Sequence, residues 1–371
     1  MSDTQVFAAT PARPAPYRGL SIADWVRANL FPDLFNGAAT IALLAVLAWY
    51  LPRFVDWAIL KAVVRPDADA CMAAHAGACW GVVAEKYRTI LFGRYPYAEQ
   101  WRPLVAVLLM LTLVVLSTQP RMWRWPLVPV WLAGMTAFVI LMGGGLAGLS
   151  PVPTNLWGGL PLTVLLSAGG MTLAFPLAIL MAMGRRSTLP VVRTVSSLYV
   201  ELIRGVPLIS VLFMASFMLP LLLPQGVKLD VLIRVLLGIG LFSAAYIAEI
   251  VRGGLQAVPR SQTEAAQSLG LGYWKTHALV LLPQALQAVL PSIVNSFIGN
   301  FKDCSLVTIV SLYELTGALS LALGGDVVWR PFFLEGYLFV AFIYWLFCFG
   351  MSRYSMRLER RLAHGQTRNR E

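Results

Sequence analysis

The chain has 371 residues, of which 58% are hydrophobic and 13% are charged, against about 45–50% and about 25% in soluble domains. With a mean hydropathy of +0.70, this composition excludes a soluble globular domain and a disordered chain, and it indicates a polytopic membrane protein. The net charge of +11 does not indicate nucleic-acid binding, because the basic residues fall in loops and tails, as is usual for Lys- and Arg-rich cytoplasmic loops.

The first 33 residues form a tail that we expect on the cytoplasmic side. Residues 1–20 are polar and rich in proline, without the pattern of a cleavable signal peptide. Apolar side chains then recur at helical spacing after Ser21: Ile22, Trp25, Val26 and Leu30. This pattern predicts a short amphipathic helix in the membrane interface.

Eight apolar stretches follow, and each is long enough to cross a hydrocarbon core of about 30 Å, which takes about 20 residues. Their expected ranges are 34–52, 103–120, 127–147, 158–184, 205–227, 231–250, 288–313 and 336–352. The third and fourth share one charge-free stretch, 125–184, which we divide at the turn-forming segments 143–145 and 150–155. The sequence therefore predicts an all-α membrane protein, a polytopic bundle of about eight transmembrane helices.

Eight spans place both termini on the same side of the membrane, and the basic residues indicate which side. With the termini inside, the inner segments carry 18 Lys and Arg and the outer segments carry eight. This bias predicts that both termini are cytoplasmic. The outer loop 61–102 argues against this orientation with six basic residues, although its four acidic residues offset part of that charge.

Two of the four cysteines, Cys71 and Cys79, lie in this expected outer loop, where an oxidising compartment allows a disulfide. Two free thiols are one alternative. A metal site with His75, which lies between them, is another, but tetrahedral zinc needs a fourth ligand and the loop has no further His or Cys. Cys304 and Cys348 fall in the seventh and eighth spans, where a thiol usually acts as a small buried hydrophobe.

The sequence contains no motif for nucleotide or metal chemistry. It has no G-x-x-x-x-G-K-[ST] phosphate loop, and its three His residues are too dispersed for metal-ligand spacing. The glycines at 143–145 lack a lysine and lie at an expected membrane turn. We therefore expect no enzymatic activity and no cofactor bound by this chain.

The loop 260–285, between the sixth and seventh spans, has the pattern of two short helices joined by a glycine turn. Ser261 or Thr263 can cap a first helix that begins at Glu264, whose carboxylate suits the positive end of a helix. A rigid knob of this kind at the membrane surface suits the docking of a partner. An ordinary interfacial elbow is the alternative.

The turn of this loop has two candidate residues, Gly270 and Gly272, either of which can end the first helix with a left-handed cap. The second helix is expected from Trp274 to about Leu282, where Pro283 ends it.

These residues carry a resemblance to a known family. Glu264-Ala265-Ala266, then Gly270, then Val280-x-Leu282-Pro283 resembles the EAA signature of ABC importer permeases, EAA-x3-G-x9-I-x-LP, with Val in place of Ile. Residues 199–208 are similar to the Y-x-E-x-I-R-G-T-P-L block of the polar amino-acid subfamily, with Val206 in place of Thr. Residues 301–306 resemble its K-x-T-S-L block, with Cys304 in place of Thr.

The resemblance covers residues 158–353 and implies a five-helix permease core with the coupling loop 260–285. The preceding segment, 34–157, is then a three-span extension, as in the larger permease subunit of general L-amino acid importers. Residues 1–33 and 354–371 are expected to be cytoplasmic tails, the second of them basic.

In this family the permease lines the path and a separate ATPase dimer uses ATP and Mg. The resemblance therefore implies a coupling role for Glu264, Ala265, Ala266, Gly270, Leu282 and Pro283. It also implies a periplasmic amino-acid-binding protein, a second permease subunit in an expected heterodimer, and the bacterial cytoplasmic (inner) membrane as the site of action.

Four ionisable residues fall within or beside the expected spans: Arg204, Glu249, Lys302 and Asp303. Such groups are costly in a membrane and usually face a cavity or a partner. They are candidates for the substrate path, because a zwitterionic amino acid needs both an anion and a cation, and pairing among themselves is the alternative. An ion-driven secondary transporter and a membrane scaffold are the rival functions, and the first is disfavoured because no second copy of the 264–283 loop is present.

Overall fold

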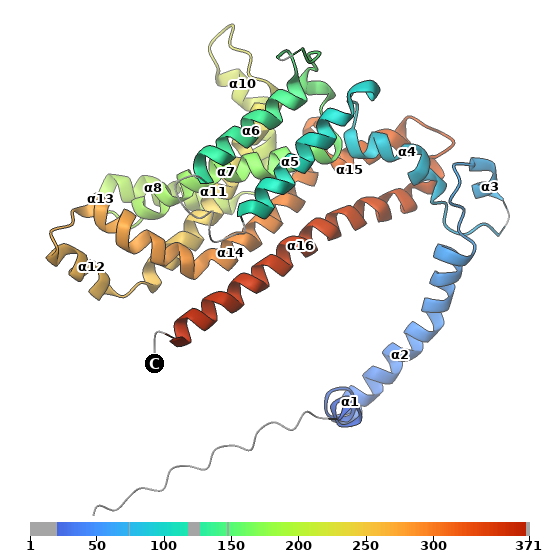
Figure 1. Cartoon of the computed structure of the whole chain (residues 1–371), viewed down its shortest axis with the longest axis horizontal. Helices are drawn as coiled ribbons and strands as arrows, with labels where there is room; N and C mark the ends of the chain where they lie inside the picture. Colours follow the sequence, from blue (N-terminus) through green and yellow to red (C-terminus); the bar gives the residue numbers. More distant parts are fainter. Residues whose placement is uncertain (1–20, 74, 118–126, 147, 369–371) are drawn as a thin grey trace, which may run out of the picture. The chain divides into compact units, whose positions relative to one another are not determined.

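The computed structural model describes residues 21–73, 75–117, 127–146 and 148–368, with side chains to residue 360 except at residue 127. Helices dominate, and no extended strand occurs in these ranges, which confirms the predicted all-α class. The chain divides into two compact units, residues 1–63 with 71–78 and residues 64–70 with 79–371. Each unit is described by itself (Figure 1).

The first unit contains α1 (Ile22–Leu30), α2 (Leu34–Val55) and a π-helical turn (Asp56–Leu60). Ser21 caps α1 by accepting a hydrogen bond from the Asp24 amide. Asp33 caps α2 through the Asn36 amide at 2.8 Å. The expected helix after Ser21 and the first expected span are therefore both present. A short helix, α3 (Ala68–Met72), follows in the loop.

The helices of the second unit are, in chain order, α4 (Gly81–Phe92), α5 (Trp101–Ser117), α6 (Leu127–Gly143), α7 (Gly159–Gly184), α8 (Pro190–Gly205), α9 (Leu208–Phe213), α10 (Leu219–Leu222), α11 (Val231–Ala257), α12 (Arg260–Ser268), α13 (Tyr273–Thr276), α14 (Leu282–Asp303), α15 (Leu315–Gly324) and α16 (Phe333–Arg368). Helix α11 is central and packs most extensively against α7 and α14. Small buried residues of α7 permit this close approach: Ala174, Ala178 and Ala182.

Six helices of the described ranges are long and apolar enough to cross a membrane, and a seventh span results if the bent pair α8–α10 is counted as one. Helix α6, which corresponds to the third expected span, is apolar but only 17 residues long. The class of fold is therefore as predicted, while the count of eight spans remains a prediction.

The fifth expected span begins and ends differently from its prediction. Gly205 ends α8, and the chain bends by 107° before the apolar helix starts at Leu208. The physical reason is Pro207, which drives Val206 out of the helical region to φ −108° and ψ 136°. Helix α10 then stops at Leu222 rather than at residue 227.

Three further differences lie toward the C-terminus. Helix α14 tightens into a 3₁₀ segment, Cys304–Val310, so the seventh span is not one uniform helix to residue 313. The buried helix α15 was not expected; Glu314 caps it by accepting hydrogen bonds from two of its amides. Helix α16 continues through most of the expected tail 354–371.

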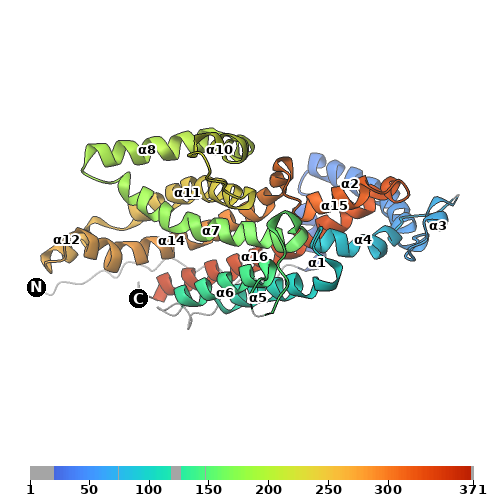
Figure 2. The ribbon, with the colours of Figure 1, turned by 90° about the horizontal axis from the view of Figure 1, so that it is seen from above.

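Helices α12 and α13 lie at one end of the second unit, and α4 and α15 lie toward the other (Figures 1 and 2). Helix α7 runs between these ends, and α4 packs against both α7 and α15. The expected coupling loop and the loop 79–102 of the extension are therefore at opposite ends of this unit.

Candidate functional site

Helix α12 ends in a hydrogen-bonded turn at Gly270. The amide of Leu271 donates to the carbonyl of Ala266 at 3.1 Å, and the amide of Gly270 donates to the carbonyl of Gln267 at 2.9 Å. These two bonds form a Schellman motif, which needs a left-handed residue after the C-cap. Gly270 has a φ of +75° and fills that position, whereas Gly272, with a φ of −70°, does not.

The start of α12 differs from its prediction. The helix begins at Arg260, its N-cap is Pro259, and no side chain caps it. The carbonyl of Pro259 accepts the hydrogen bond of the Gln262 amide at 3.1 Å. Proline fixes φ near the helical value and ends the preceding helix, so α12 can start directly after it. The expected caps Ser261 and Thr263 therefore lie inside the first turn.

We call α12, the Gly270 turn and α13 the knob (residues 260–276). Glu264 and Ala265 are exposed on it, while Ala266 is 3% exposed and packs inward. Large apolar side chains are also exposed, with Leu269 at 81% and Trp274 at 67%. An exposed apolar cluster beside a carboxylate is typical of a protein-docking surface.

The second helix of the knob does not end at Pro283. A π-helical turn, His277–Leu281, joins α13 to α14, so the helix is continuous through the proline. A proline ring clashes with the carbonyl four residues earlier, here that of Leu279. The wider π turn just before Pro283 relieves such a clash.

The helices on either side of the knob touch each other through their backbones. A Cβ atom at Gly254, near the end of α11, would lie 2.7 Å from the carbonyl oxygen of Ala285 in α14. Leu255 and Leu281 are buried in the same apolar cluster. A force on the knob therefore acts on two tightly packed helices of the bundle.

The carboxylate of Glu249, in α11, is surrounded by three guanidinium groups. Arg185 and Arg252 each lie 2.5 Å from it, and Arg204 lies 3.8 Å away. Arg185 also lies 3.4 Å from Glu201. This ion-pair network joins α7, α8 and α11. Two of the four candidates for the substrate path, Arg204 and Glu249, are therefore paired with each other, which was the alternative to lining the path.

The other members of this network were not found from the sequence. Arg252 stands three residues after Glu249 on one helix, so helical spacing was a usable signal for that contact. Arg185 and Glu201 lie far from Glu249 in the chain and carried no such signal.

Lys302 and Asp303 are exposed near the C-terminal end of α14, and their side chains form no ion pair or hydrogen bond with the residues that the structure describes. Two residues before Lys302, the amide of the Asn300 side chain donates to the Ser167 carbonyl at 3.1 Å, and its oxygen accepts from Ser243 at 3.3 Å. Asn300 thus fixes α14 against α7 and α11, while the charged pair remains accessible.

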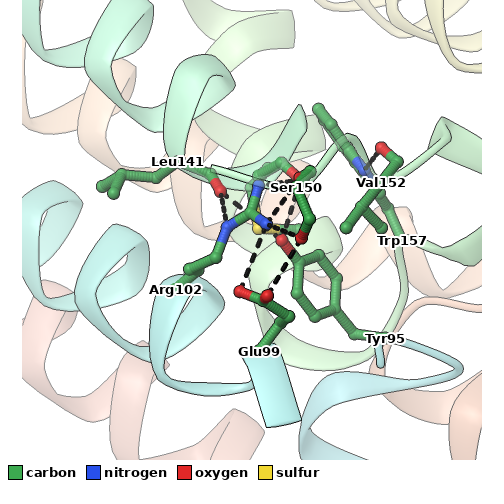
Figure 3. A network of polar contacts seen from close by, with 8 residues as sticks. Tyr95, Glu99, Arg102, Leu141, Ser150, Val152 and Trp157 are labelled. Atoms are coloured by element: carbon green, nitrogen blue, oxygen red, sulfur yellow. Dashed lines mark hydrogen bonds and ion pairs between the residues drawn. The ribbon is translucent and has the colours of Figure 1, made fainter. Parts of the chain in front are cut away.

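The end of the extension is held together by Arg102, whose side chain is fully buried (Figure 3). Its Nε donates to the Leu141 carbonyl at 2.7 Å, and Nη1 donates to the Ser150 carbonyl at 2.9 Å and lies 3.4 Å from Glu99. The Tyr95 hydroxyl donates to the carbonyl of Met142 at 2.9 Å. Arg102 thus satisfies carbonyls at the C-terminal end of α6, where a cation is favoured.

The four cysteines and His75, the candidate metal ligand, form no metal site within the described residues. Cys304 is buried and Cys348 is partly buried, and both are free thiols. Burial of Cys71 and Cys79 is nearly complete, and the amide of Cys79 donates to the carboxylate of Glu335 at 3.0 Å. No group of three candidate metal ligands comes together within the described part of the chain.

The chain is similar to known transport proteins over nearly its whole length. Residues 174–364 match the family described as binding-protein-dependent transport system inner membrane component. An inner membrane amino-acid ABC transporter permease protein of Escherichia coli, YhdY, is 43% identical over 98% of this chain and 99% of its own length. The glutamate/glutamine/aspartate/asparagine transport system permease protein BztC of Rhodobacter capsulatus is 35% identical over the same shares.

Shorter proteins match about half of this chain. A probable amino-acid ABC transporter permease protein of Bacillus subtilis, YckA, is 33% identical over 56% of this chain and 88% of its own length. A solved structure of an amino acid ABC transporter with histidines is 30% identical, with a TM-score of 0.48, over 55% of this chain and 92% of that chain. The family match includes the knob and Glu249, and two relatives match end to end. The chain therefore belongs to the family of binding-protein-dependent transport system inner membrane components.

Proposed function

We propose that this chain is the membrane-spanning permease subunit of an ATP-driven amino-acid importer and forms its translocation path. The observation that carries the proposal is the knob, a rigid and exposed pair of helices joined directly to two helices of the bundle that touch at Gly254. The amino-acid substrate class follows from the names of both full-length relatives.

A separate ATPase dimer would bind the knob and use ATP and Mg. Glu264, Ala265 and Pro283 are exposed and would contact it. Ala266, Gly270 and Leu282 support the knob instead: Ala266 is buried within it, Gly270 forms its turn, and Leu282 packs against the apolar cluster below it. The absence of a phosphate loop from the sequence agrees with energy supplied by a partner.

Lys302 and Asp303 are the better candidates for the substrate path, because they are accessible and carry both charges that a zwitterion needs. Glu249 and Arg204 belong to an ion-pair network, so we assign them first to holding α7, α8 and α11 together. A second permease subunit, in a heterodimer, would complete the path, and a periplasmic binding protein would deliver the amino acid.

Both termini are proposed to be cytoplasmic, in the bacterial inner membrane. The six basic residues of the loop 61–102 were the counter-argument to this orientation. Three of them are paired with carboxylates: Lys61 with Asp56, Lys86 with Asp326, and Arg102 with Glu99. The support for the proposed orientation is the excess of 18 Lys and Arg in the inner segments over eight in the outer segments.

A disulfide between Cys71 and Cys79 is proposed for the loop. Its support is that the free cysteines of the described residues are Cys304 and Cys348, and that Cys71 and Cys79 are both buried in the loop. Mass spectrometry of a digest made without reductant should find one peptide pair joined through Cys71 and Cys79. Equal alkylation of all four cysteines before reduction would exclude the bond.

The function is tested by purifying the full chain from its native membrane with its partners and reconstituting it in liposomes. We expect uptake of labelled amino acids that requires enclosed ATP and a soluble binding protein, and an ATPase that co-purifies. An ion gradient that drives uptake by the chain alone would favour the secondary transporter. Co-purification of an ATPase without any uptake would favour a scaffold.

A further inference from the structure

Helix α16 is longer than a membrane span. It has 36 residues, and its first 20, from Phe333 to Ser352, carry a single charge. At about 1.5 Å per residue, these 20 residues cover roughly 30 Å, the thickness of the hydrocarbon core. The rest of the helix must then begin in the headgroup layer.

One face of α16 carries an exposed aromatic ladder. Phe342 stacks on Trp345 with ring centroids 5.9 Å apart, and Trp345 stacks on Phe349 at 5.1 Å. All three side chains are about half exposed in the described chain. The guanidinium of Arg353 lies over Phe349 at 5.8 Å and continues the ladder toward the C-terminus.

The opposite face of the same segment is covered. Ser355 is 4% exposed and Leu358 is 6% exposed. Arg353 and Arg357 are exposed. The part of α16 after Ser352 therefore packs against the protein on one side. On its other side it presents two arginines, C-terminal to the aromatic ladder.

The height of these arginines matches the phosphate layer. Counting from Ser352, Arg353 is about 1.5 Å and Arg357 about 7.5 Å beyond the hydrocarbon boundary, and each headgroup layer is roughly 5–8 Å thick. Residues four apart on a helix lie on the same face, about 6 Å apart, so both guanidinium groups can reach one phosphate. This geometry holds for either orientation of the helix.

We propose that the face formed by Phe342, Trp345, Phe349, Arg353 and Arg357 binds one anionic phospholipid. Its acyl chains would lie along the aromatic ladder, and its phosphate would lie between the two guanidinium groups. Charge complementarity selects an anionic lipid, because two arginines face the headgroup position and a zwitterionic lipid would bring a cation there as well. The ladder fits a lipid because its rings are apolar and lie at the depth of the chains.

The experiment uses the full chain, purified in detergent with any co-purifying partners, and native mass spectrometry with added phosphatidylglycerol or phosphatidylcholine. The wild-type protein should retain phosphatidylglycerol more strongly than phosphatidylcholine. The double substitution Arg353→Ser/Arg357→Ser should weaken phosphatidylglycerol retention about 30-fold, since each arginine contributes roughly 1 kcal/mol at such a surface. Retention of phosphatidylcholine should not change.

The matched control is Arg330→Ser, which removes an exposed arginine just before the start of α16 and should leave retention unchanged. Equal retention by wild-type and double-substituted protein would overturn the proposal, as would equal retention of the two lipids. A second test is Trp345→Cys in native membranes. An intermolecular disulfide with a Trp345→Cys copy, or a cross-link to another subunit, would show that protein covers this face and would also overturn it.

Discussion

The carboxylate of Glu249 lies 2.5 Å from the guanidinium of Arg185, the residue that follows the last turn of α7. Through this contact α11, which carries Glu249 and leads into the knob, is joined to the end of α7. Arg185 also lies at the negative C-terminal end of the α7 dipole, so both Glu249 and the dipole stabilise its positive charge. The network around Glu249 is therefore a structural connection between the knob end of the bundle and its central helices.

The contributions of the arginines around Glu249 can be separated by double-mutant cycles. We expect Glu249→Gln with Arg185→Gln to give a coupling free energy of about 1 kcal/mol, because both side chains are only partly exposed. The cycle with Arg204→Gln should give a few tenths, since that pair is 3.8 Å apart and Arg204 is more exposed. Thermal unfolding in detergent measures both, and equal couplings would contradict the assigned geometry.

The turn of the knob depends on a left-handed residue. Gly270 has a φ of +75°, and a Cβ atom at this position would have no neighbour within 4 Å, so a substitution meets strain but no clash. Gly270→Val should cost roughly 1–2 kcal/mol locally and abolish ATP-driven uptake without loss of membrane insertion. Gly270→Asn is the control and should keep most of the uptake, because asparagine tolerates this conformation. Wild-type uptake by the valine variant would count against coupling.

Two adjacent glycines in α11 test the backbone contact below the knob. Gly254→Ala places a Cβ 2.7 Å from the Ala285 carbonyl and should destabilise the protein by roughly 1–3 kcal/mol. Gly253→Ala places its Cβ in open space and should stabilise α11 by roughly 0.5–1 kcal/mol. Thermal unfolding in detergent measures the loss of stability expected for Gly254→Ala and the gain expected for Gly253→Ala. A similar effect of the two substitutions would refute the close contact of α11 and α14.

The buried Arg102 should be essential for the fold of the extension. Arg102→Met removes the donor to the Ser150 carbonyl and the shorter of two hydrogen bonds to the Leu141 carbonyl, and should cost about 3 kcal/mol. Arg94→Met removes the same charge from an exposed guanidinium that lies over Tyr313, and about 1 kcal/mol or less is expected. Unfolding in detergent distinguishes them, and equal losses would argue against the network in Figure 3.

The pair Lys86–Asp326, 2.7 Å apart, should make stability depend on pH. The hydrogen bond with Lys86 lowers the pKa of Asp326 below its ordinary value. A lowered folded-state pKa stabilises the protein above the ordinary pKa of about 3.9, and this stabilisation is lost as the pH falls through the folded value. The stability difference between wild type and Lys86→Met should therefore be present at pH 7 and shrink toward pH 3. A stability difference that stays the same from pH 7 to pH 3 would refute a contribution of the Lys86–Asp326 pair.

The expected helices and their approximate order could be predicted because apolar length decides which segments can enter a bilayer. The knob was also largely predictable, because Gly270 and its spacing from Glu264 are local features of the chain. Its N-cap was predicted wrongly, since Pro259 allows α12 to start four residues earlier than the side-chain signals suggested. The stop at Pro283 was wrong because a π turn accommodates the proline.

The sequence by itself determined the class of protein, the approximate positions of most apolar helices and the family resemblance, because these depend on composition and on spacing along one chain. Only the tertiary structure decided the partners of Glu249, the burial of Arg102 and the contact of Gly254 with Ala285. Such contacts join residues distant in the chain, and their energies depend on distance and burial. Neither distance nor burial is fixed until the helices pack against one another.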